Sequence, residues 1–322
     1  MKHLIDPGRT RPSIFHFDHI VYSHVEDLNG DPLVLELSIL SPMEGKELQI
    51  ALDRKKPEEN PDARTDGAVG KAGVNQRPVI VWFNGNGFRE VDKHCQIGDL
   101  AFLAEAGYAV CFVQFRNSAQ GKLPAQLIDA KTAIRFLRAH AAQYSIDPNR
   151  IAVAGRSAGG MIVSMLGLND ERFLSEEWAG YSSSVQAVWD LFGLVDLARH
   201  SREEVSSYKN GTADTNRWKR AEDTHTGAVI GGNVDTMPVR AEEFTAQLGV
   251  HDKMPPFLIM HGDADPAVPY QESVAFYDKI SSYPGNDVDL YLVHGAGHGT
   301  PEFFQPAVQK IALDFFEKKL RG

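Results

Sequence analysis

The sequence predicts an α/β fold in which helices cover both faces of a mostly parallel central sheet. Short, continuously apolar runs recur along the chain, and between them lie segments whose apolar residues have helical spacing. A strand buried on both faces is apolar at every position, whereas a strand with one solvated face alternates. The chain has 322 residues, of which 43% are hydrophobic and 24% charged, so residues 1–322 are expected to form a single domain with a large core.

The first part of the chain has a different pattern. Residues 14–52 are rich in β-forming side chains, and antiparallel strands are expected at 33–40 and 47–52. Residues 54–78 are polar, contain many prolines, glycines and aspartates, and lack periodicity. This composition predicts a surface loop rather than a linker between two domains.

From residue 79 onward, apolar runs and amphipathic segments alternate, which is the pattern of a parallel sheet covered by helices. The expected strands are 79–83, 108–115, 150–155, 185–193, 255–262 and 288–295, and the expected helices are 96–107, 123–144, 271–280 and 303–320. A polar segment, 196–254, interrupts the alternation and is expected to form a small, irregular insertion.

One serine between glycines stands where a predicted strand passes directly into a predicted helix. Residues 155–159 read Gly-Arg-Ser-Ala-Gly, the pattern G-x-S-x-G. A tight turn from strand to helix strains the backbone of such a serine and exposes its hydroxyl above the strand ends. The flanking glycines let neighbouring backbone approach without Cβ clashes. Ser157 is therefore the candidate nucleophile, and the N–H of Ala158, at a helix N-terminus, is placed to bind an anion.

A histidine is needed as the base, because a serine hydroxyl is a poor nucleophile until its proton is taken. The predicted strand 288–295 and the loop after it contain His294 and His298. His294 still belongs to the end of the predicted strand. His298 lies in a glycine-rich loop that can swing over Ser157, so His298 is the favoured base.

An acid that orients the base is expected between the serine and the histidine in the sequence, which is one of the known orders of such triads. The predicted strand 255–262 is followed by Asp263 and Asp265, at the edge of a parallel sheet where ligand sites form. We favour Asp265, because Pro266 fixes the chain just after it. Asp263 remains the alternative, with a turn-capping role as its other explanation.

At these motifs the sequence resembles the α/β-hydrolase esterases, in particular bacterial feruloyl and acetyl esterases, which neighbour the hormone-sensitive-lipase-like carboxylesterases. The resemblance spans residues 78–300 and is carried by the stretches PVIVWFNGNGF, LPAQLIDAKTAIRFLRAHAAQYSIDPNRIAVAGRSAGG, FGLVDL, PPFLIMHGDADPAVP and GAGHG. In that family the acid is the second aspartate of H-G-x-x-D-x-x-V-P, which is Asp265 here. The histidine of G-x-G-H-G is His298.

The loop after the first central strand departs from this family. The family has His-Gly-Gly-Gly there, and its backbone amides help to bind the oxyanion, whereas this chain has Asn84, Gly85, Asn86 and Gly87. Asparagine tolerates positive φ better than other residues with a side chain. The resemblance therefore implies an oxyanion hole built from the N–H groups of Gly85, Asn86 and Ala158.

Charge, apolar runs and cysteine content restrict the binding partners and the cellular compartment that we expect for this protein. The formal net charge is 33 minus 43, or −10, and there is no basic stripe, which argues against nucleic acid. The first residues lack the apolar core of a signal peptide, and no run is long enough to span a membrane. Cys95 and Cys111 require no disulfide, so a reducing cytoplasm is the expected compartment. Assembly into a homo-oligomer is left open.

Neither a cofactor nor a metal is expected. His16, His19 and His24 lie close together near the N-terminus, but this stretch has the pattern of a strand and offers no cysteine partner for a metal.

These observations predict a serine hydrolase that cleaves small or medium esters, such as acetyl, aryl or hydroxycinnamoyl esters, through an acyl-enzyme, with 196–254 as a cap over the site. An amidase, a peptidase or an arylformamidase-like enzyme would use the same triad. A binding protein with this fold and no catalytic activity is the third alternative.

Overall fold

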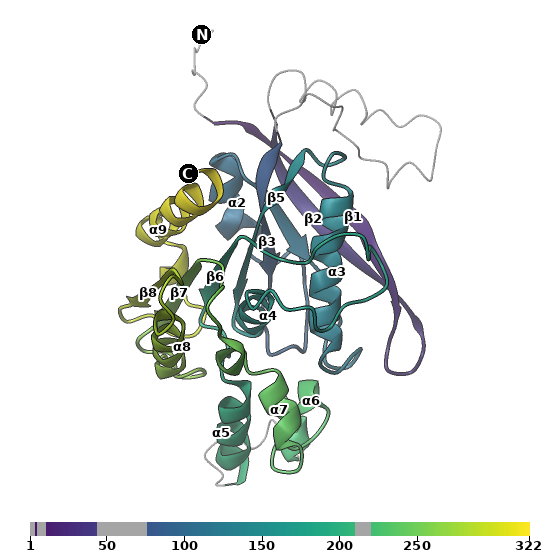
Figure 1. The fold of residues 1–322 in the computed structure, drawn as a ribbon, viewed down its shortest axis with the longest axis vertical. Coiled ribbons are helices and arrows are strands. Elements are labelled where there is room, and N and C mark those ends of the chain that lie inside the picture. Colours follow the sequence, from purple (N-terminus) through teal and green to yellow (C-terminus); the bar gives the residue numbers. More distant parts are fainter. Residues whose placement is uncertain (1–3, 5–10, 44–75, 210–219) are drawn as a thin grey trace.

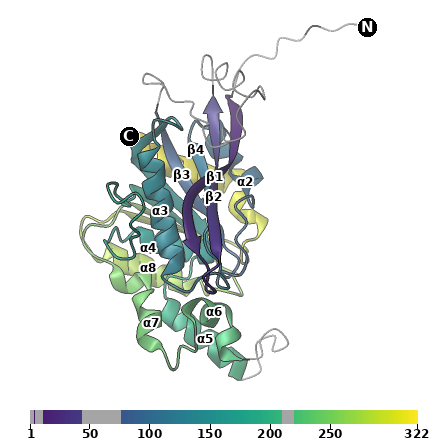
Figure 2. The same ribbon diagram turned by 90° about the vertical axis from the view of Figure 1, so that its right-hand side faces the viewer.

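The structure, a computed structural model, describes residues 4, 11–43, 76–209 and 220–322. An eight-stranded sheet runs through its centre in the order β1-β2-β4-β3-β5-β6-β7-β8 (Figures 1 and 2). The strands are β1 (Ser13–Glu26), β2 (Pro32–Met43), β3 (Arg77–Phe83), β4 (Ala109–Val113), β5 (Ile146–Arg156), β6 (Ala187–Leu191), β7 (Phe257–Gly262) and β8 (Val288–Val293).

The sheet is mostly parallel, as the apolar runs predict. Strands β3 to β8 pair in parallel, whereas β1 and β2 form an antiparallel hairpin whose second strand pairs antiparallel with β4. The Asp27 carboxylate closes the hairpin by accepting the backbone N–H groups of Asn29 and Asp31 at 2.7 and 3.0 Å, the behaviour that makes aspartate common in turns.

Helices cover both faces of the sheet. The described α-helices are α2 (Ile97–Glu105), α3 (Ala125–Ala139), α4 (Ala158–Leu166), α5 (Leu197–Lys209), α6 (His225–Ile230), α7 (Pro238–Glu243), α8 (Gln271–Ser281) and α9 (Pro306–Phe316). Alternate residues of β3 face opposite layers: Val79 and Val81 join the core formed with α3, α4 and α8, whereas Ile80 and Trp82 join the core formed with α2 and α9. A strand packed in this way is apolar at every position.

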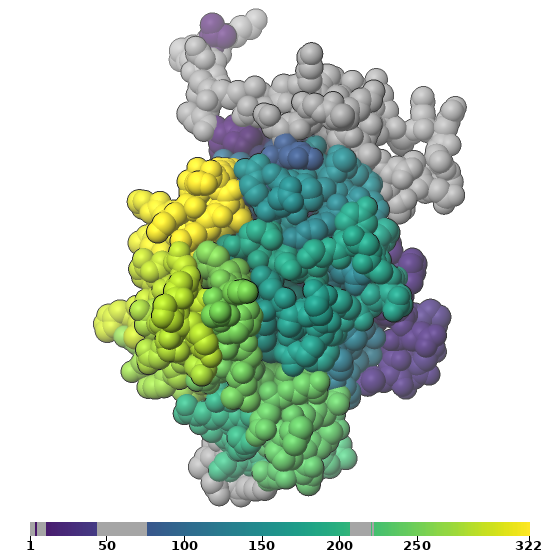
Figure 3. All heavy atoms as spheres, in the orientation of Figure 1, coloured from purple at the N-terminus to yellow at the C-terminus, as the bar shows by residue number. Residues whose placement is uncertain are grey.

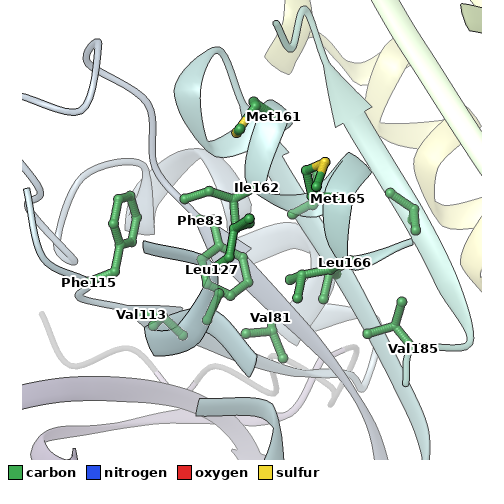
Figure 4. Packing of buried hydrophobic residues seen from close by; sticks show 14 of the residues in the cluster. Val81, Phe83, Val113, Phe115, Leu127, Met161, Ile162, Met165, Leu166 and Val185 are labelled. Carbon is green, nitrogen blue, oxygen red and sulfur yellow. The ribbon is translucent and has the colours of Figure 1, made fainter. Parts of the chain in front are cut away.

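Helix α4 is buried along its whole length, because it follows the central strand β5 and packs on the sheet beside α3, with the 3₁₀ turn η3 (Ala246–Gly249) also against it. Met161, Ile162, Met165 and Leu166 belong to the same buried cluster as Val81 and Phe83 of β3 and Val113 of β4, and Ile162 lies by Phe83 (Figure 4). The start of α4 is therefore held against the sheet both by apolar packing and by its direct connection to β5 through Ser157.

The described part of 196–254 is more regular than its sequence suggests. It contains α5, α6 and α7, together with the short 3₁₀ turns η2 (Ala221–Asp223) and η3 (Ala246–Gly249). Helices α6 and α7 have six residues each, too few to show apolar periodicity. The three α-helices lie together beyond the lower end of the sheet, and they form the lower end of the molecule (Figures 1, 2 and 3).

The segment 196–254 contacts loops that follow the central strands. The Leu123 N–H donates to the Val229 carbonyl at 2.9 Å, and Arg240 donates to the Leu123 carbonyl. Arg89, in the loop after β3, donates to the Asp223 carbonyl.

Several predicted boundaries differ from those in the structure. The predicted strand 47–52 and residues 54–75 of the predicted loop lie outside the described residues, and β3 already begins at Arg77. The predicted strand 108–115 is shorter, since β4 spans 109–113. The predicted helix 303–320 is divided into η4 (Pro301–Phe304), α9 and the terminal turn η5 (Glu317–Arg321). Pro306 explains the first break, because proline favours the first helical turn over the helix interior.

Candidate active site

Ser157 occupies the turn between β5 and α4 with φ 53° and ψ −120°, a backbone conformation that residues with a side chain rarely adopt. The turn is very tight. A β-carbon at Gly155 would lie 2.5 Å from the Gly159 carbonyl oxygen, and one at Gly159 would overlap the Phe83 carbonyl of β3. The two glycines of G-x-S-x-G are thus required by close backbone approach, as the sequence predicts.

His298 connects the candidate nucleophile and the candidate acid. Its Nε2 lies 2.8 Å from Ser157 Oγ, and its Nδ1 lies 2.7 Å from Asp265 Oδ2. An ionised carboxylate can only accept a hydrogen bond, so Nδ1 carries the proton and a neutral His298 accepts the serine hydroxyl through Nε2. The structure therefore brings together the three residues chosen from the sequence, in the tautomer that deprotonation of Ser157 requires.

Asp265 is held ionised by its neighbours. Its side chain is fully buried, and its Oδ1 accepts the N–H groups of Ala267 and Val268 at 2.8 and 3.0 Å. Burial alone would raise the pKa of the carboxyl, but hydrogen bonds from His261 and His298 outweigh burial and hold that pKa well below its usual range. Asp265 therefore remains a carboxylate at neutral pH.

The alternative pair, Asp263 and His294, lies outside this chain of hydrogen bonds. His294 Nδ1 is 2.8 Å from Asp263 Oδ2, and the His294 side chain is 98% exposed. Asp263 also accepts the N–H of Gly295 at 2.6 Å. The pair thus ties together the loops that follow β7 and β8, and it makes no contact with Ser157.

The loop after β3 lies directly against the serine turn, since a β-carbon at Gly85 would come within 2.9 Å of Ser157 Cβ. Of the two oxyanion donors expected in this loop, the N–H of Gly85 is already hydrogen-bonded, whereas the N–H of Asn86 has no acceptor among the described residues. The Gly85 N–H donates to Asn84 Oδ1 at 2.9 Å, so this amide already has a partner. Asn86 has φ 92°, the positive φ expected of it, and its side-chain amide donates to Glu90 at 3.3 Å.

Of the three expected donors, the backbone N–H groups of Asn86 and Ala158 are the two that are left unpaired in the described part of the chain. Neither backbone N–H donates to another of the residues that the structure describes. The Ala158 N–H is at the first position of α4, where the helix leaves backbone donors unpaired and favours negative charge.

Asn84 has a role that the sequence did not reveal. It is buried, and its Oδ1 accepts both the Gly85 N–H and Nε of Arg156, the latter at 3.0 Å. Arg156 directly precedes Ser157, so this side chain links the loop after β3 to the serine turn.

Two further buried residues support the site. His261, on β7, lies 3.3 Å from Asp265 Oδ2, and its ring nitrogens contact Ser273 Oγ at 2.7 Å and the Val268 carbonyl at 2.9 Å. Asp190, on β6, accepts a hydrogen bond from the hydroxyl of Ser164, on α4, at 2.9 Å. Burial raises the pKa of the Asp190 carboxyl to about 7. Both positions lie within apolar runs that predict strands, so the sequence gives no sign of their contacts.

Aromatic rings from two elements border the site. Phe192, directly after β6, is buried, and its ring packs against His298 with centroids 4.8 Å apart. His225 of α6 lies over Gly87, where an added β-carbon would collide with the imidazole. Glu204 of α5 holds this imidazole through Nδ1 at 3.1 Å. The segment 196–254 therefore reaches the edge of the candidate oxyanion loop.

A family model described as BD-FAE matches residues 68–280, well over half of the chain. This range includes the loop after β3, Ser157 and Asp265. It ends before His298.

Curated relatives are esterases. Esterase LipC of Mycobacterium tuberculosis is 28% identical over 225 residues, which are 69% of this chain and 53% of LipC. A probable isoprenylcysteine alpha-carbonyl methylesterase, ICMEL1 of Arabidopsis thaliana, is 24% identical over 80% of this chain and 55% of its own length. The chain thus spans about half the length of the curated relatives it matches.

Solved structures share the architecture. A truncated carbohydrate esterase from gut microbiota superposes with a TM-score of 0.72 at 24% identity, covering 98% of this chain and 99% of the other. Esterase Est2 of Thermogutta terrifontis gives a TM-score of 0.66 at 20% identity, covering 96% of this chain and 94% of Est2. These likenesses show the α/β-hydrolase fold. None of the helices in the described ranges is long and apolar enough to cross a membrane.

Proposed function

Because this chain belongs to the BD-FAE family of α/β-hydrolase esterases, we propose that it hydrolyses carboxylic esters with Ser157 as nucleophile, His298 as base and Asp265 as the orienting acid. The observation that carries this proposal is the continuous hydrogen-bond chain from Ser157 Oγ through His298 to Asp265, with distances of 2.8 and 2.7 Å. Such a chain on a strained strand-to-helix turn activates a serine for attack on a carbonyl carbon.

In the acylation half of the reaction, His298 Nε2 takes the hydroxyl proton as Ser157 Oγ bonds to the ester carbonyl carbon. The carbonyl electron pair moves onto oxygen and gives a tetrahedral oxyanion. Asp265 stabilises the imidazolium that forms, and its buried carboxylate needs no reorganisation at that moment. His298 then gives its proton to the alkoxide as the ester C–O bond breaks, which releases the alcohol and leaves an acyl group on Ser157.

Deacylation repeats these steps with water. His298 takes a proton from water as the water oxygen bonds to the acyl carbon, and a second oxyanion forms. The Ser157 Oγ–acyl bond then breaks, and the proton on His298 returns to Ser157. The free acid and the resting enzyme result, without a cofactor.

The oxyanion is assigned to the backbone N–H groups of Asn86 and Ala158. Gly85 is a supporting residue in this proposal, because its N–H is already held by Asn84 Oδ1. Two preorganised amides beside the serine would stabilise the charge that develops on the carbonyl oxygen.

Small and medium acyl groups are the proposed substrates. Est2 of Thermogutta terrifontis, which shares the fold, is described with propionate and with butyrate bound, and the fold relative from gut microbiota is described as a carbohydrate esterase. Within this class we propose acetyl, aryl and hydroxycinnamoyl esters, and the propionate and butyrate of Est2 support the short acyl groups among them. The curated relatives named above are esterases, so esters are favoured over amides.

Hydrolysis of matched substrates tests this function. We expect the wild type to hydrolyse p-nitrophenyl acetate and butyrate, and to act far more slowly on the matched p-nitroanilides. Ser157→Ala should lower kcat for the best ester by several orders of magnitude, with an unchanged circular dichroism spectrum. A preference for the anilides would replace the esterase by an amidase. An alanine variant that keeps more than a few per cent of the wild-type rate on the best ester would exclude Ser157 as nucleophile.

The two aspartates after β7 provide a matched pair. We expect Asp265→Asn to lower kcat on the order of 10⁴-fold, because an amide there no longer fixes the required tautomer of His298. Asp263→Asn should have a minor effect, since its partner His294 is exposed and away from the serine. The measurement is kcat for p-nitrophenyl butyrate together with the melting temperature. Equal losses in the two variants would contradict the assignment of the acid.

The two asparagines of the loop after β3 separate backbone from side-chain roles. Asn86→Gly keeps the N–H and permits φ 92°, so we expect kcat within about tenfold of wild type. Asn84→Ala removes the acceptor of Gly85 and Arg156, which frees the loop to move; a misplacement of about 1 Å can cost about 10²-fold. If the glycine variant falls as far as the alanine variant, the Asn86 side chain is itself a donor to the oxyanion.

A further inference from the structure

Three side chains that could ligate a metal converge between α5 and α8, away from the serine. They are His200 and Glu203 on α5 and Glu272 in the first turn of α8, and their ligand atoms lie within 4.8 Å of one another. His200 and Glu203 are three residues apart in sequence and so share one face of α5. Glu272 comes from a distant part of the sequence, so sequence spacing does not reveal the cluster.

Glu272 is the buried member and lacks hydrogen-bond partners. Its side chain is fully buried, and no described residue donates a hydrogen bond to Oε1 or to Oε2. His200 Nδ1, 3.5 Å from Glu272 Oε1, is also buried without a hydrogen-bond partner. A buried carboxylate without donors is costly, and such groups are normally paired or bound to a metal.

Three other buried carboxylates each accept several hydrogen bonds. Asp265 accepts two backbone N–H groups and a histidine, Asp190 accepts Ser164 and the Gly193 N–H, and Glu204 accepts His225 and Thr226. Glu272 differs from all three. An ion pair with a protonated His200 would engage one of its oxygens and leave the other without a donor.

We propose that His200, Glu203 and Glu272 bind a divalent transition-metal cation of the zinc type. Zinc takes histidine nitrogen and carboxylate oxygen at about 2.0–2.2 Å, which places neighbouring ligand atoms roughly 3.3 Å apart in a tetrahedron. The 3.5 Å between His200 and Glu272 is close to this separation. A mixed nitrogen and oxygen set favours zinc over calcium, which prefers oxygen ligands.

Glu203 would complete the site by a side-chain movement. It is 44% exposed, and its Oε1 is paired with Arg199 at 2.8 Å. An exposed ion pair of this kind contributes little to stability, so the carboxylate is free to turn towards the cation. Solvent at this edge can supply water as the fourth ligand.

The proposed cation would fasten the segment 196–254 to the body of the fold. Helix α5 belongs to that segment, whereas α8 follows the loop that contains Asp265. Ser273, next to Glu272, contacts His261, which in turn contacts Asp265. The cation would therefore hold α5 against α8 and support Asp265 indirectly, through Ser273 and His261.

Zinc binding by the full-length chain tests this proposal. After removal of metals with a chelator, ZnCl₂ is titrated by calorimetry, and the melting temperature is measured with and without zinc. We expect one zinc per chain and a melting temperature raised by a few degrees. Glu272→Gln and Glu203→Gln should each weaken zinc binding at least about 10²-fold, because even loss of a group that only supports a ligand costs 10–100-fold.

Controls separate this site from other places where zinc could bind. Glu242→Gln removes an exposed carboxylate of α7 that pairs with Arg202, and His298→Ala removes the histidine beside the serine; both should bind zinc like the wild type. Glu272→Gln should fold, since it keeps the side-chain volume and removes a buried charge. Absence of zinc binding by the wild type, or binding that survives Glu272→Gln and is lost in His298→Ala, would overturn the proposal.

Discussion

The backbone of Ser157 is the constraint on which the rest of the site depends. Its φ of 53° places the side chain above the end of β5 and turns the chain at once into α4. Gly155 and Gly159 permit this geometry, because a β-carbon at either position would meet neighbouring backbone. The strain is offset by the burial of α4 in the core, so the nucleophile and the first amide of the helix are held rigidly together.

Everything else in the site is placed relative to this turn. Asn84 links the loop after β3 to Arg156, directly before the serine. The backbone N–H groups of Asn86 and Ala158 have no partner among the described residues. The loops after β7 and β8 deliver Asp265 and His298 from the same edge of the sheet, as the topology of parallel strands requires. The network around Asp265 keeps the acid ionised and the histidine in one tautomer.

Sequence patterns predicted the parts that have a local signature. The alternation of apolar runs and helices predicted the sheet, and the G-x-S-x-G pattern predicted the turn at Ser157. Chain order restricted the acid and the base to two residues each, and Pro266 and the glycine-rich loop favoured Asp265 and His298. Contacts between distant residues were missed: the Asn84 bridge, the support of Asp265 by His261, and the meeting of His200 with Glu272 depend on packing that no short stretch encodes. Helices α6 and α7 were missed because six residues are too few to show apolar periodicity. Helix α5 was missed because it is mostly polar, with Leu197, Ala198 and Val205 among its buried apolar residues.

We propose that the hydrogen-bond chain ending at Ser157 makes this one serine a strong nucleophile. The direct measurement is the mass of the intact chain after treatment with a fluorophosphonate, followed by peptide mapping of the adduct. We expect one phosphonyl group per chain, located on Ser157, and strongly slowed labelling in the His298→Ala variant. An unlabelled wild-type chain, an adduct on another residue, or equal labelling rates with and without His298 would contradict it.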